Sequence, residues 1–196
     1  MQSFSVMTLL FFGSAQFKPF FINLWLHEAH LAHYPQPKFL KQFKDLNERE
    51  RIYASVIAEG DEGVGRILSL LKELKIDNNT LVVFSTDNGP EFTRDETHKY
   101  HGKTESDGYG GYYSIGETGG LKGKKRSLFA GGIRVPFIVR WPGVVPKGVT
   151  DSTSVVTAVD LLPTFLDAAG VSPPTDYQPD GESILSAFKG TPIKRT

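Results

Sequence analysis

The chain has 196 residues, of which 39% are hydrophobic and 22% are charged, values typical of a globular protein that buries a core. Lys and Arg together number 22, as do Asp and Glu, so the formal charge is zero and nothing indicates a nucleic-acid-binding or polybasic membrane surface. Cysteine is absent, which excludes a disulfide scaffold, a thiolate metal site and a cysteine nucleophile within this chain.

The first residues, MQSFSVMTLLFFGSAQ, contain an apolar run of signal-peptide length but lack the positive residue that begins such a signal. Two interpretations remain, a weak export signal or ordinary core sequence at the head of a truncated chain, and we favour the second. No stretch reaches the roughly 18–20 consecutive apolar residues that a transmembrane helix needs.

Two apolar runs and one long periodic segment predict the first half of the fold. Phe20–Leu26 and Leu81–Ser85 are nearly continuous in apolar residues, which is typical of strands buried on both faces. From about Glu48 to Lys75, apolar residues recur at helical spacing. Glycines at 60, 63 and 65 indicate either a bend in that helix or a close packing partner.

The second half begins with a long polar segment. Residues 93–119 lack periodic apolar residues, so we expect them to be the least ordered part of the chain. Ile133–Arg140 predicts a strand at a sheet edge or bulge because it contains Pro136, and Val155–Val159 predicts another short strand. A helix is predicted over Leu161–Ala169, capped by Asp160 and ended by Gly170. Strands that alternate with helices predict an α/β protein with a mostly parallel central sheet.

Asp87 and Asn88 follow the predicted strand Leu81–Ser85, at the end where α/β proteins place their chemistry. A carboxylate beside an amide oxygen suits a hard divalent cation such as calcium or magnesium. The same residues, followed by Gly89, are also favoured in an ordinary turn, so both interpretations stay open.

Five histidines are the other titratable candidates. His27, His30 and His33 lie three residues apart after the first predicted strand and suit proton donation or anion contact in a cleft. Zinc ligation and simple surface exposure are the alternatives, because no helical H-E-x-x-H spacing is present. We expect His98 and His101 to be solvated.

Positive charge is concentrated at Lys122, Lys124, Lys125 and Arg126. Lysine is a compact charge that can hold a tetrahedral oxyanion such as sulfate or phosphate. No G-x-x-x-x-G-K-[ST] pattern is present, so a nucleotide-binding P-loop is not indicated. A solvated run of charges is the alternative.

Taken in order, these segments resemble one family. Residues 19–30 read PFFINLWLHEAH, where the sulfatase family has P-F-F-L-N-x-W-x-H-E-P-H. Residues 79–89 read NTLVVFSTDNG and resemble N-T-[LI]-V-[VI]-F-x-S-D-N-G. Residues 123–136 read GKKRSLFAGGIRVP and resemble G-x-K-x-x-x-[YF]-E-G-G-x-R-V-P. Matches also occur at WPG (141–143), DLLPT (160–164) and DG (180–181).

The resemblance is to arylsulfatases and N-acetylgalactosamine-6-sulfatases, and it implies the C-terminal portion of an alkaline-phosphatase-like α/β domain with its N-terminal part missing. We divide the chain accordingly into residues 1–18, outside the family pattern, and residues 19–196, a partial catalytic domain. By the same resemblance, Asp87 and Asn88 match ligands of the family's calcium ion, Lys125 matches the lysine that contacts the sulfate, and His30 matches the histidine on the sulfate and leaving-group side.

The departures from the family pattern concern the nucleophile. The family makes its formylglycine from the cysteine or serine of C-x-P-x-R or S-x-P-x-R, and the nearest string here, Ser172-Pro-Pro-Thr175, lacks both the spacing and the arginine. The early aspartates that complete the family's metal site are also missing, and Ala130 replaces a glutamate. We therefore expect the isolated chain to be inactive.

Three functions follow from this pattern. The first is a sulfuric ester hydrolase acting on aryl or sugar sulfates, present here as a fragment that a missing N-terminal half would complete. The second is an inactive remnant of the sulfatase fold that acts as a binding protein. The third is a related phosphatase or phosphonate hydrolase using zinc or manganese, which the Asp-Asn-Gly and Gly-Gly-x-Arg motifs disfavour. The family is usually extracytoplasmic, but the weak signal leaves the compartment of this chain unassigned.

Overall fold

The structure is a computed structural model, and it describes residues 5–14 and 16–195. The chain divides into two compact units. The first unit comprises Asn23–Glu73 and Val83–Ile138, together with the described residues up to Thr8. The second comprises Leu9–Ile22, Leu74–Val82 and the chain from Val139 onward.

Four strands form one sheet, in the order β2-β1-β3-β4, and each contributes residues to both units. Their bounds are Ser5–Phe11 (β1), Phe20–Leu26 (β2), Thr80–Thr86 (β3) and Phe137–Arg140 (β4). The sheet is antiparallel, so the predicted mostly parallel sheet is not confirmed. The physical reason is β1, which pairs between β2 and β3. These two strands run in the same direction, as strands joined by a helix do, but they are not neighbours.

Position in the sheet explains which apolar strands are buried. Leu81, Val82 and Val83 of the inner strand β3 are buried, which confirms that prediction. Strand β2 lies at the edge, where Phe21 and Trp25 are exposed, so the prediction of a strand buried on both faces is wrong there. Residues 5–11 form an inner strand whose apolar residues Met7, Leu9 and Phe11 are buried, as core sequence is.

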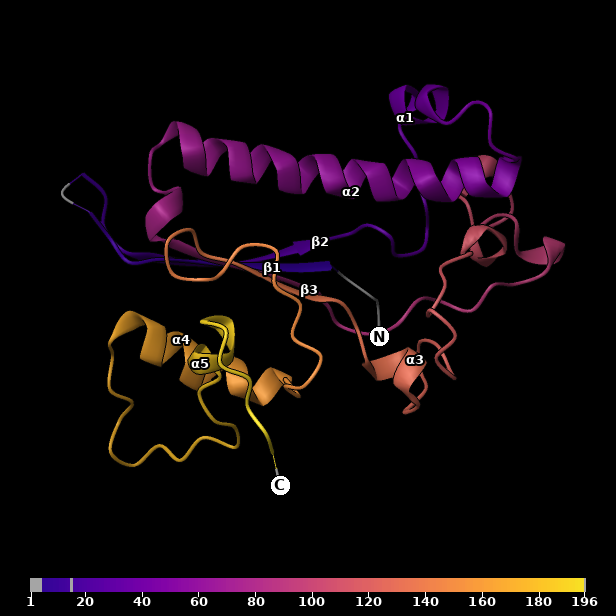
Figure 1. Cartoon of the computed structure of the whole chain (residues 1–196). Helices are drawn as coiled ribbons and strands as arrows, with labels where there is room; N and C mark the ends of the chain where they lie inside the picture. Colours follow the sequence, from indigo (N-terminus) through magenta and orange to yellow (C-terminus); the bar gives the residue numbers. More distant parts are fainter. Residues whose placement is uncertain (1–4, 15, 196) are drawn as a thin grey trace. The chain divides into compact units, whose positions relative to one another are not determined.

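Helices α1 (Pro37–Gln42) and α2 (Glu48–Glu73) lie side by side in the first unit (Figure 1). The predicted long helix is confirmed. Gly60 marks a close approach, because a Cβ there would lie 3.2 Å from the Glu28 side chain, whereas Gly63 has no atom within 4 Å of such a Cβ. The prediction that a packing partner approaches the helix closely at a glycine is therefore confirmed at Gly60.

Residues 93–119 do not lack structure, although the sequence predicts little order there. They contain three short 3-10 turns. Within the segment, Tyr109 forms an isolated bridge with Tyr100, and it forms another with His33 outside the segment. Tyr113 is fully buried, and the turn that holds it packs on α2. Tyrosines at loop positions supply the apolar area that a search for periodic aliphatic residues overlooks.

The second unit contains α4 (Leu161–Ala169) and α5 (Leu185–Phe188), which pack together (Figure 1). Gly170 ends α4 in the left-handed conformation, as predicted. Asp160 does not cap α4 with its side chain, because that carboxylate points back to the N–H and hydroxyl of Thr157. Val155–Val159, all described, form no strand, so that prediction is wrong.

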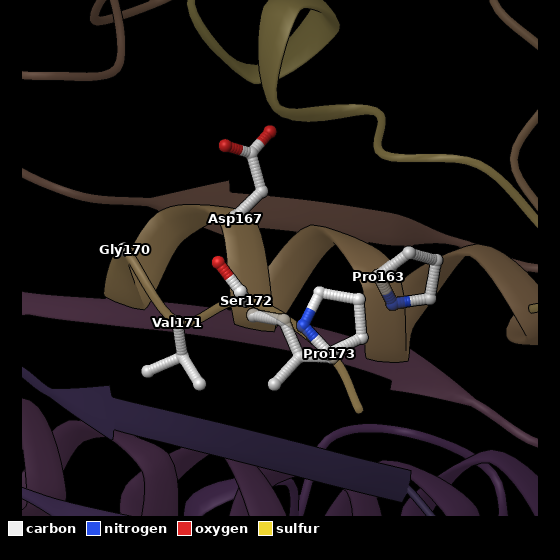
Figure 2. Close-up of a pocket in the computed structure, with 7 residues that line it drawn as sticks. Pro163, Asp167, Gly170, Val171, Ser172 and Pro173 are labelled. Atoms are coloured by element: carbon white, nitrogen blue, oxygen red, sulfur yellow. The ribbon is translucent and has the colours of Figure 1, made fainter. Parts of the chain in front are cut away.

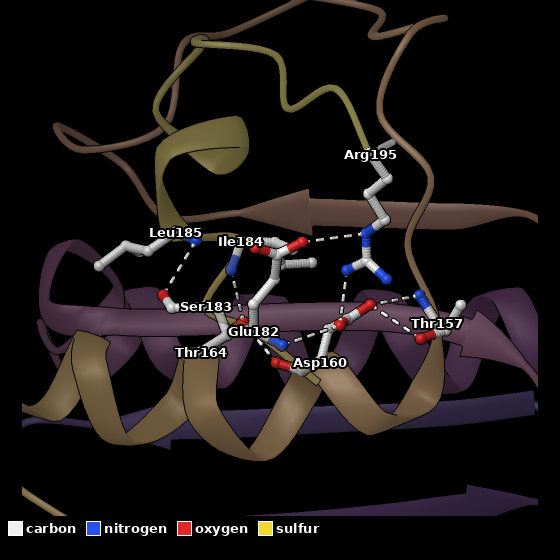
Figure 3. A network of polar contacts seen from close by, with 8 residues as sticks. All are labelled: Thr157, Asp160, Thr164, Glu182, Ser183, Ile184, Leu185 and Arg195. Atoms are coloured by element: carbon white, nitrogen blue, oxygen red, sulfur yellow. Dashed lines mark hydrogen bonds and ion pairs between the residues drawn. The ribbon is translucent and has the colours of Figure 1, made fainter. Parts of the chain in front are cut away.

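The carboxylate of Asp160 is fully buried and lies at the centre of a polar network that ties the end of the chain to α4 (Figure 3). Arg195 pairs with it at 2.6 Å, and the backbone N–H of Glu182 donates to it at 3.2 Å. The hydroxyl of Thr164 accepts the N–H of Ile184 and donates to the carbonyl of Asp160. Each polar group in this network has a partner, which is the condition under which a buried charge is tolerated.

Candidate functional site

The turn that follows β3 carries the two predicted metal ligands. The hydroxyl of Thr86 donates to the carbonyl of Asn88 at 3.0 Å and closes the turn. Asp87 is exposed, whereas the side-chain oxygen of Asn88 is buried and has no hydrogen-bond partner among the described residues. A buried amide oxygen without a donor, next to a carboxylate, is suited to a hard divalent cation.

Backbone hydrogen bonds join this turn to the basic segment more than thirty residues later. The N–H of Gly89 donates to the carbonyl of Gly132 at 2.8 Å, and the N–H of Lys125 donates to the carbonyl of Pro90 at 2.9 Å. A Cβ on Gly89 would lie 1.9 Å from the carbonyl oxygen of Gly131, so only glycine permits this approach. The structure thus brings the Asp87–Asn88 turn and the Lys125 segment together.

The side chain of Lys125 is 3% exposed, which excludes the interpretation of this residue as part of a solvated charge run. Its ammonium lies 3.6 Å from the carboxylate of Glu91, which is itself buried. Arg126 holds the same carboxylate with two hydrogen bonds, at 2.5 and 3.0 Å. Among Glu91, Lys125 and Arg126, two cations meet one anion, and of the two cations it is Lys125 that is shielded from water.

The charges around Glu91 settle its ionisation. Burial alone would raise the pKa of this carboxyl, but the hydrogen bonds from Arg126 and the N–H of Phe92, with the nearby charge of Lys125, hold it below its ordinary value. Glu91 is therefore ionised at neutral pH. An ionised carboxylate between two cations orients both of them.

His30 lies within electrostatic range of the same group. Burial lowers the pKa of His30, the positive charges of Lys125 and His27 lower it further, and a hydrogen bond to Leu31 and the charge of Glu91 oppose the shift. Because the carbonyl of Leu31 can only accept, Nδ1 of the neutral His30 ring is the donor to it, which leaves the other ring nitrogen able to accept. A lowered pKa makes the protonated ring a stronger acid that is populated only at acidic pH.

The other histidines differ from one another. His33 is buried, its ring lies 3.2 Å from the hydroxyl of Ser114, and burial lowers its pKa to about 4. His98 and His101 are exposed, as expected, and His98 pairs with Asp95. Among residues 5–14 and 16–195, no group of three or more His, Cys, Asp or Glu side chains is arranged to hold a metal ion, so the zinc interpretation gains no support.

Glu91 is the site residue that the sequence analysis missed. It stands two residues beyond the predicted turn, and 34 positions separate it from Lys125 along the chain. The one signal in the sequence is a need for countercharge, because a buried lysine beside an arginine requires an anion. Nothing in the sequence identifies which acidic residue supplies it.

The second unit contains a shallow hollow (Figure 2). It is lined by Pro163, Leu166, Asp167, Gly170, Val171, Ser172 and Pro173. Asp167 accepts a hydrogen bond from Ser183, and no cation lines the hollow in the part of the chain that the structure describes. It therefore lacks the charge that an anionic substrate requires.

Comparison with known proteins gives concordant matches. The family model described as Sulfatase matches residues 6–171, a range that begins at the second residue of β1. The steryl-sulfatase of Rattus norvegicus is 33% identical over 174 residues, which make up 88% of this chain and 27% of that protein. The N-acetylgalactosamine-6-sulfatase of Canis lupus familiaris is 34% identical over 177 residues, 88% of this chain and 29% of that protein.

A solved structure gives the same picture in three dimensions. The crystal structure of Ps i-CgsB in complex with k-i-k-neocarrahexaose superimposes with a TM-score of 0.68 at 28% identity, covering 85% of this chain and 33% of that one. This chain thus spans less than a third of the length of the two curated relatives named above. No helix in the described ranges is long and apolar enough to cross a membrane.

Proposed function

The chain belongs to the sulfatase family, and from this membership we propose that it forms the cation- and sulfate-binding part of a sulfuric ester hydrolase. Membership of the family implies the alkaline-phosphatase-like α/β fold and a sulfate-ester substrate. One observation carries the proposal. Backbone hydrogen bonds from Gly89 to Gly132 and from Lys125 to Pro90 hold the segment after the Asp87–Asn88 turn beside the buried Lys125, which supports a single site for the cation and the sulfate.

The roles of the residues follow from their chemistry. Lys125 offsets negative charge on the sulfate oxygens, because its ammonium is the surplus cation of the site. His30 in its protonated form hydrogen-bonds or protonates the departing oxygen. Its lowered pKa confines that form to acidic solution, so we expect sulfate-ester binding that depends on His30 to weaken as pH rises through this pKa.

Asp87 and Asn88 would hold the divalent cation, with calcium expected and magnesium as the alternative. When bound, such an ion supplies positive charge that stabilises the sulfate group during ester cleavage. The two side chains contribute far fewer than the six to eight oxygens that calcium takes, so we expect weak binding, with a dissociation constant of about 1 mM or weaker.

The nucleophile has no source in these 196 residues. The sequence contains no cysteine, and Ser172, in the string nearest to the family motif, lines the hollow in the second unit. We therefore propose that a segment bearing the formylglycine precursor must be supplied from elsewhere for turnover. The names of the relatives point to steroid and sugar sulfates, and we propose an aryl or sugar sulfate ester as the substrate class.

The test uses the purified chain. Calorimetry should detect binding of calcium and of methyl sulfate, the first lost in D87A and the second lost in K125M. An aryl sulfate should not be hydrolysed, even with calcium added. Turnover that survives purification and disappears in K125A would overturn the expected inactivity and reveal an unrecognised nucleophile. Binding that neither substitution changes would contradict the assignment of the site.

The alternative, an inactive remnant that binds other molecules, rests on the absent precursor residue. Reading the coding DNA upstream of Met1 separates the two. An in-frame C-x-P-x-R or S-x-P-x-R would support a hydrolase, and a stop codon in every frame would support the remnant.

A further inference from the structure

We propose that Glu91 is a positioning residue, which holds the ammonium of Lys125 at the candidate sulfate site and is itself anchored by Arg126. The inference rests on the proposed function, since it assigns to Glu91 the orientation of the lysine that would meet the substrate. It adds a residue that the motif comparison in the sequence did not single out.

The contacts of the Glu91 carboxylate define this role. One oxygen accepts from Arg126 at 2.5 Å, and the other accepts from the second guanidinium nitrogen at 3.0 Å and lies 3.6 Å from the Lys125 ammonium. The N–H of Phe92 donates to the first oxygen at 2.9 Å. Arg126 and the N–H of Phe92 therefore hold the carboxylate without any contribution from Lys125. A carboxylate held in this way can in turn orient a second side chain.

The backbone brings both cations to this carboxylate. Lys125 and Arg126 are consecutive, and neighbouring side chains in an extended strand point to opposite faces. Arg126 adopts a φ of 68°, in the left-handed region that non-glycine residues rarely occupy. The N–H of Lys125 donates to the carbonyl of Pro90, which precedes Glu91, so this change of backbone direction lies next to Glu91. Such a conformation costs free energy, and it is retained here where two consecutive cations meet one anion.

The difference in exposure assigns different tasks to the two cations. The Arg126 side chain is 56% exposed and the Lys125 side chain is 3% exposed. The bidentate pair of Arg126 and Glu91 is neutral as a unit, so Glu91, Arg126 and Lys125 together carry one net positive charge, and the Lys125 ammonium presents it in a site of low exposure. One such charge matches a sulfate monoester, which carries one negative charge, and the carboxylate restrains the flexible lysine stem.

The test measures how well Lys125 is held. Reductive methylation of the purified chain, followed by peptide mass spectrometry, gives the labelling rate of each lysine. In E91Q we expect Lys125 to label about tenfold faster, because its buried ion pair is lost. The matched control is E62Q, which removes the carboxylate of the exposed pair with Lys38, 2.6 Å apart. There the rate at Lys38 should change less than about twofold.

Three outcomes overturn the proposal. The first is a labelling rate at Lys125 in E91Q within about twofold of the original, with unchanged thermal unfolding. The second is faster labelling together with unchanged affinity for methyl sulfate, because the lysine would then not need this support to bind. If E91Q does not fold, E91D replaces it and should label Lys125 about threefold faster, since the shorter side chain draws the carboxylate back. The third outcome that overturns the proposal is an unchanged labelling rate at Lys125 in E91D.

Failure of the proposed function gives a different result. If the original chain and both variants all fail to bind methyl sulfate, the assignment of a sulfate site is wrong. The labelling rates in E91Q and E91D still decide whether Glu91 holds Lys125.

Discussion

Two buried carboxylates, Glu91 in the first unit and Asp160 in the second, are each paired with an arginine, yet their surroundings differ. Asp160 accepts hydrogen bonds from the N–H and hydroxyl of Thr157 and from the N–H of Glu182, and its cationic partner Arg195 also meets Glu182 (Figure 3). Glu91 instead faces two cations, one of them buried.

The difference lies in the balance of charge. Around Asp160 the two described anions, Asp160 and Glu182, outnumber the cation, Arg195, and the contacts among these residues hold the end of the chain to α4. Around Glu91 the cations exceed the anions by one, and the buried amide oxygen of Asn88 nearby has no described donor. A network whose cation is matched by its own anions stabilises the fold. A network with excess positive charge and an unused acceptor can still bind a ligand.

The largest loss of stability should come from removing the carboxylate at the centre of the Asp160 network. Asp160→Ala leaves Arg195 and two N–H groups without their acceptor, so we expect a loss of about 3–5 kcal/mol in unfolding free energy, measured by urea titration. Asp151→Ala is the matched control, because that carboxylate also accepts two backbone N–H groups but is exposed. Equal losses in the two variants would contradict the importance of burial.

The two units should also lose stability in different pH ranges. The pKa of His33 falls to about 4 in the folded chain from an ordinary 6.5, so its contribution is complete above pH 6.5 and is lost as pH falls toward 4. This shift corresponds to roughly 3 kcal/mol. Burial alone would raise the pKa of Asp160, but Arg195 and the Thr157 donors hold it below 3.8, so its contribution is lost only in stronger acid.

Hydrogen exchange followed by mass spectrometry, unit by unit, checks this order of acid sensitivity. In His33→Gln, the first unit should lose less protection between pH 6.5 and 4 than in the original chain. Protection that disappears from both units at the same pH, in the original and in the variant, would contradict the assignment.

A smaller effect is expected at the glycine that closes the site. Gly89→Ala places a methyl group against the carbonyl of Gly131, and we expect a loss of about 2 kcal/mol together with loss of methyl sulfate binding. Gly63→Ala, inside α2 with open space around it, should instead stabilise by about 0.5–1 kcal/mol. Calorimetric unfolding measures both. A neutral Gly89→Ala would mean that the turn and the Lys125 segment need not approach so closely.

The smallest change in stability should distinguish the two sets of cations. Lys125→Met removes the surplus charge and leaves Glu91 paired with Arg126, so we expect the unfolding free energy to change by less than about 1 kcal/mol while sulfate binding is lost. Arg195→Met removes the cation described at Asp160 and should lower the unfolding free energy by more than Lys125→Met does. Thermal unfolding of both variants measures this difference. A larger loss of stability in Lys125→Met than in Arg195→Met would show that the lysine is structural.

The residues proposed for the site could be picked out in the sequence because they lie in local motifs. The turn at Asp87–Asn88 ends a short apolar strand, and the spacing of Lys125 from Gly131 and Gly132 lies within one segment, so both are visible as motifs. Glu91 was missed because its role depends on a pairing across 34 positions. His33 and His30 look equivalent in the sequence, and only packing decides that the first is fully buried and the second is not.

The sequence by itself determined the long helix α2, the strand β3 and the family, because periodicity, apolar runs and ordered motifs are properties of neighbouring residues. The tertiary structure alone decided the order of the strands. Residues 5–11 insert between β2 and β3, which makes the sheet antiparallel and moves the apolar β2 to an exposed edge. It also decided which lysine is buried and which carboxylate meets it. Burial and charge pairing depend on distances between segments far apart in the chain, and local pattern carries no measure of those distances.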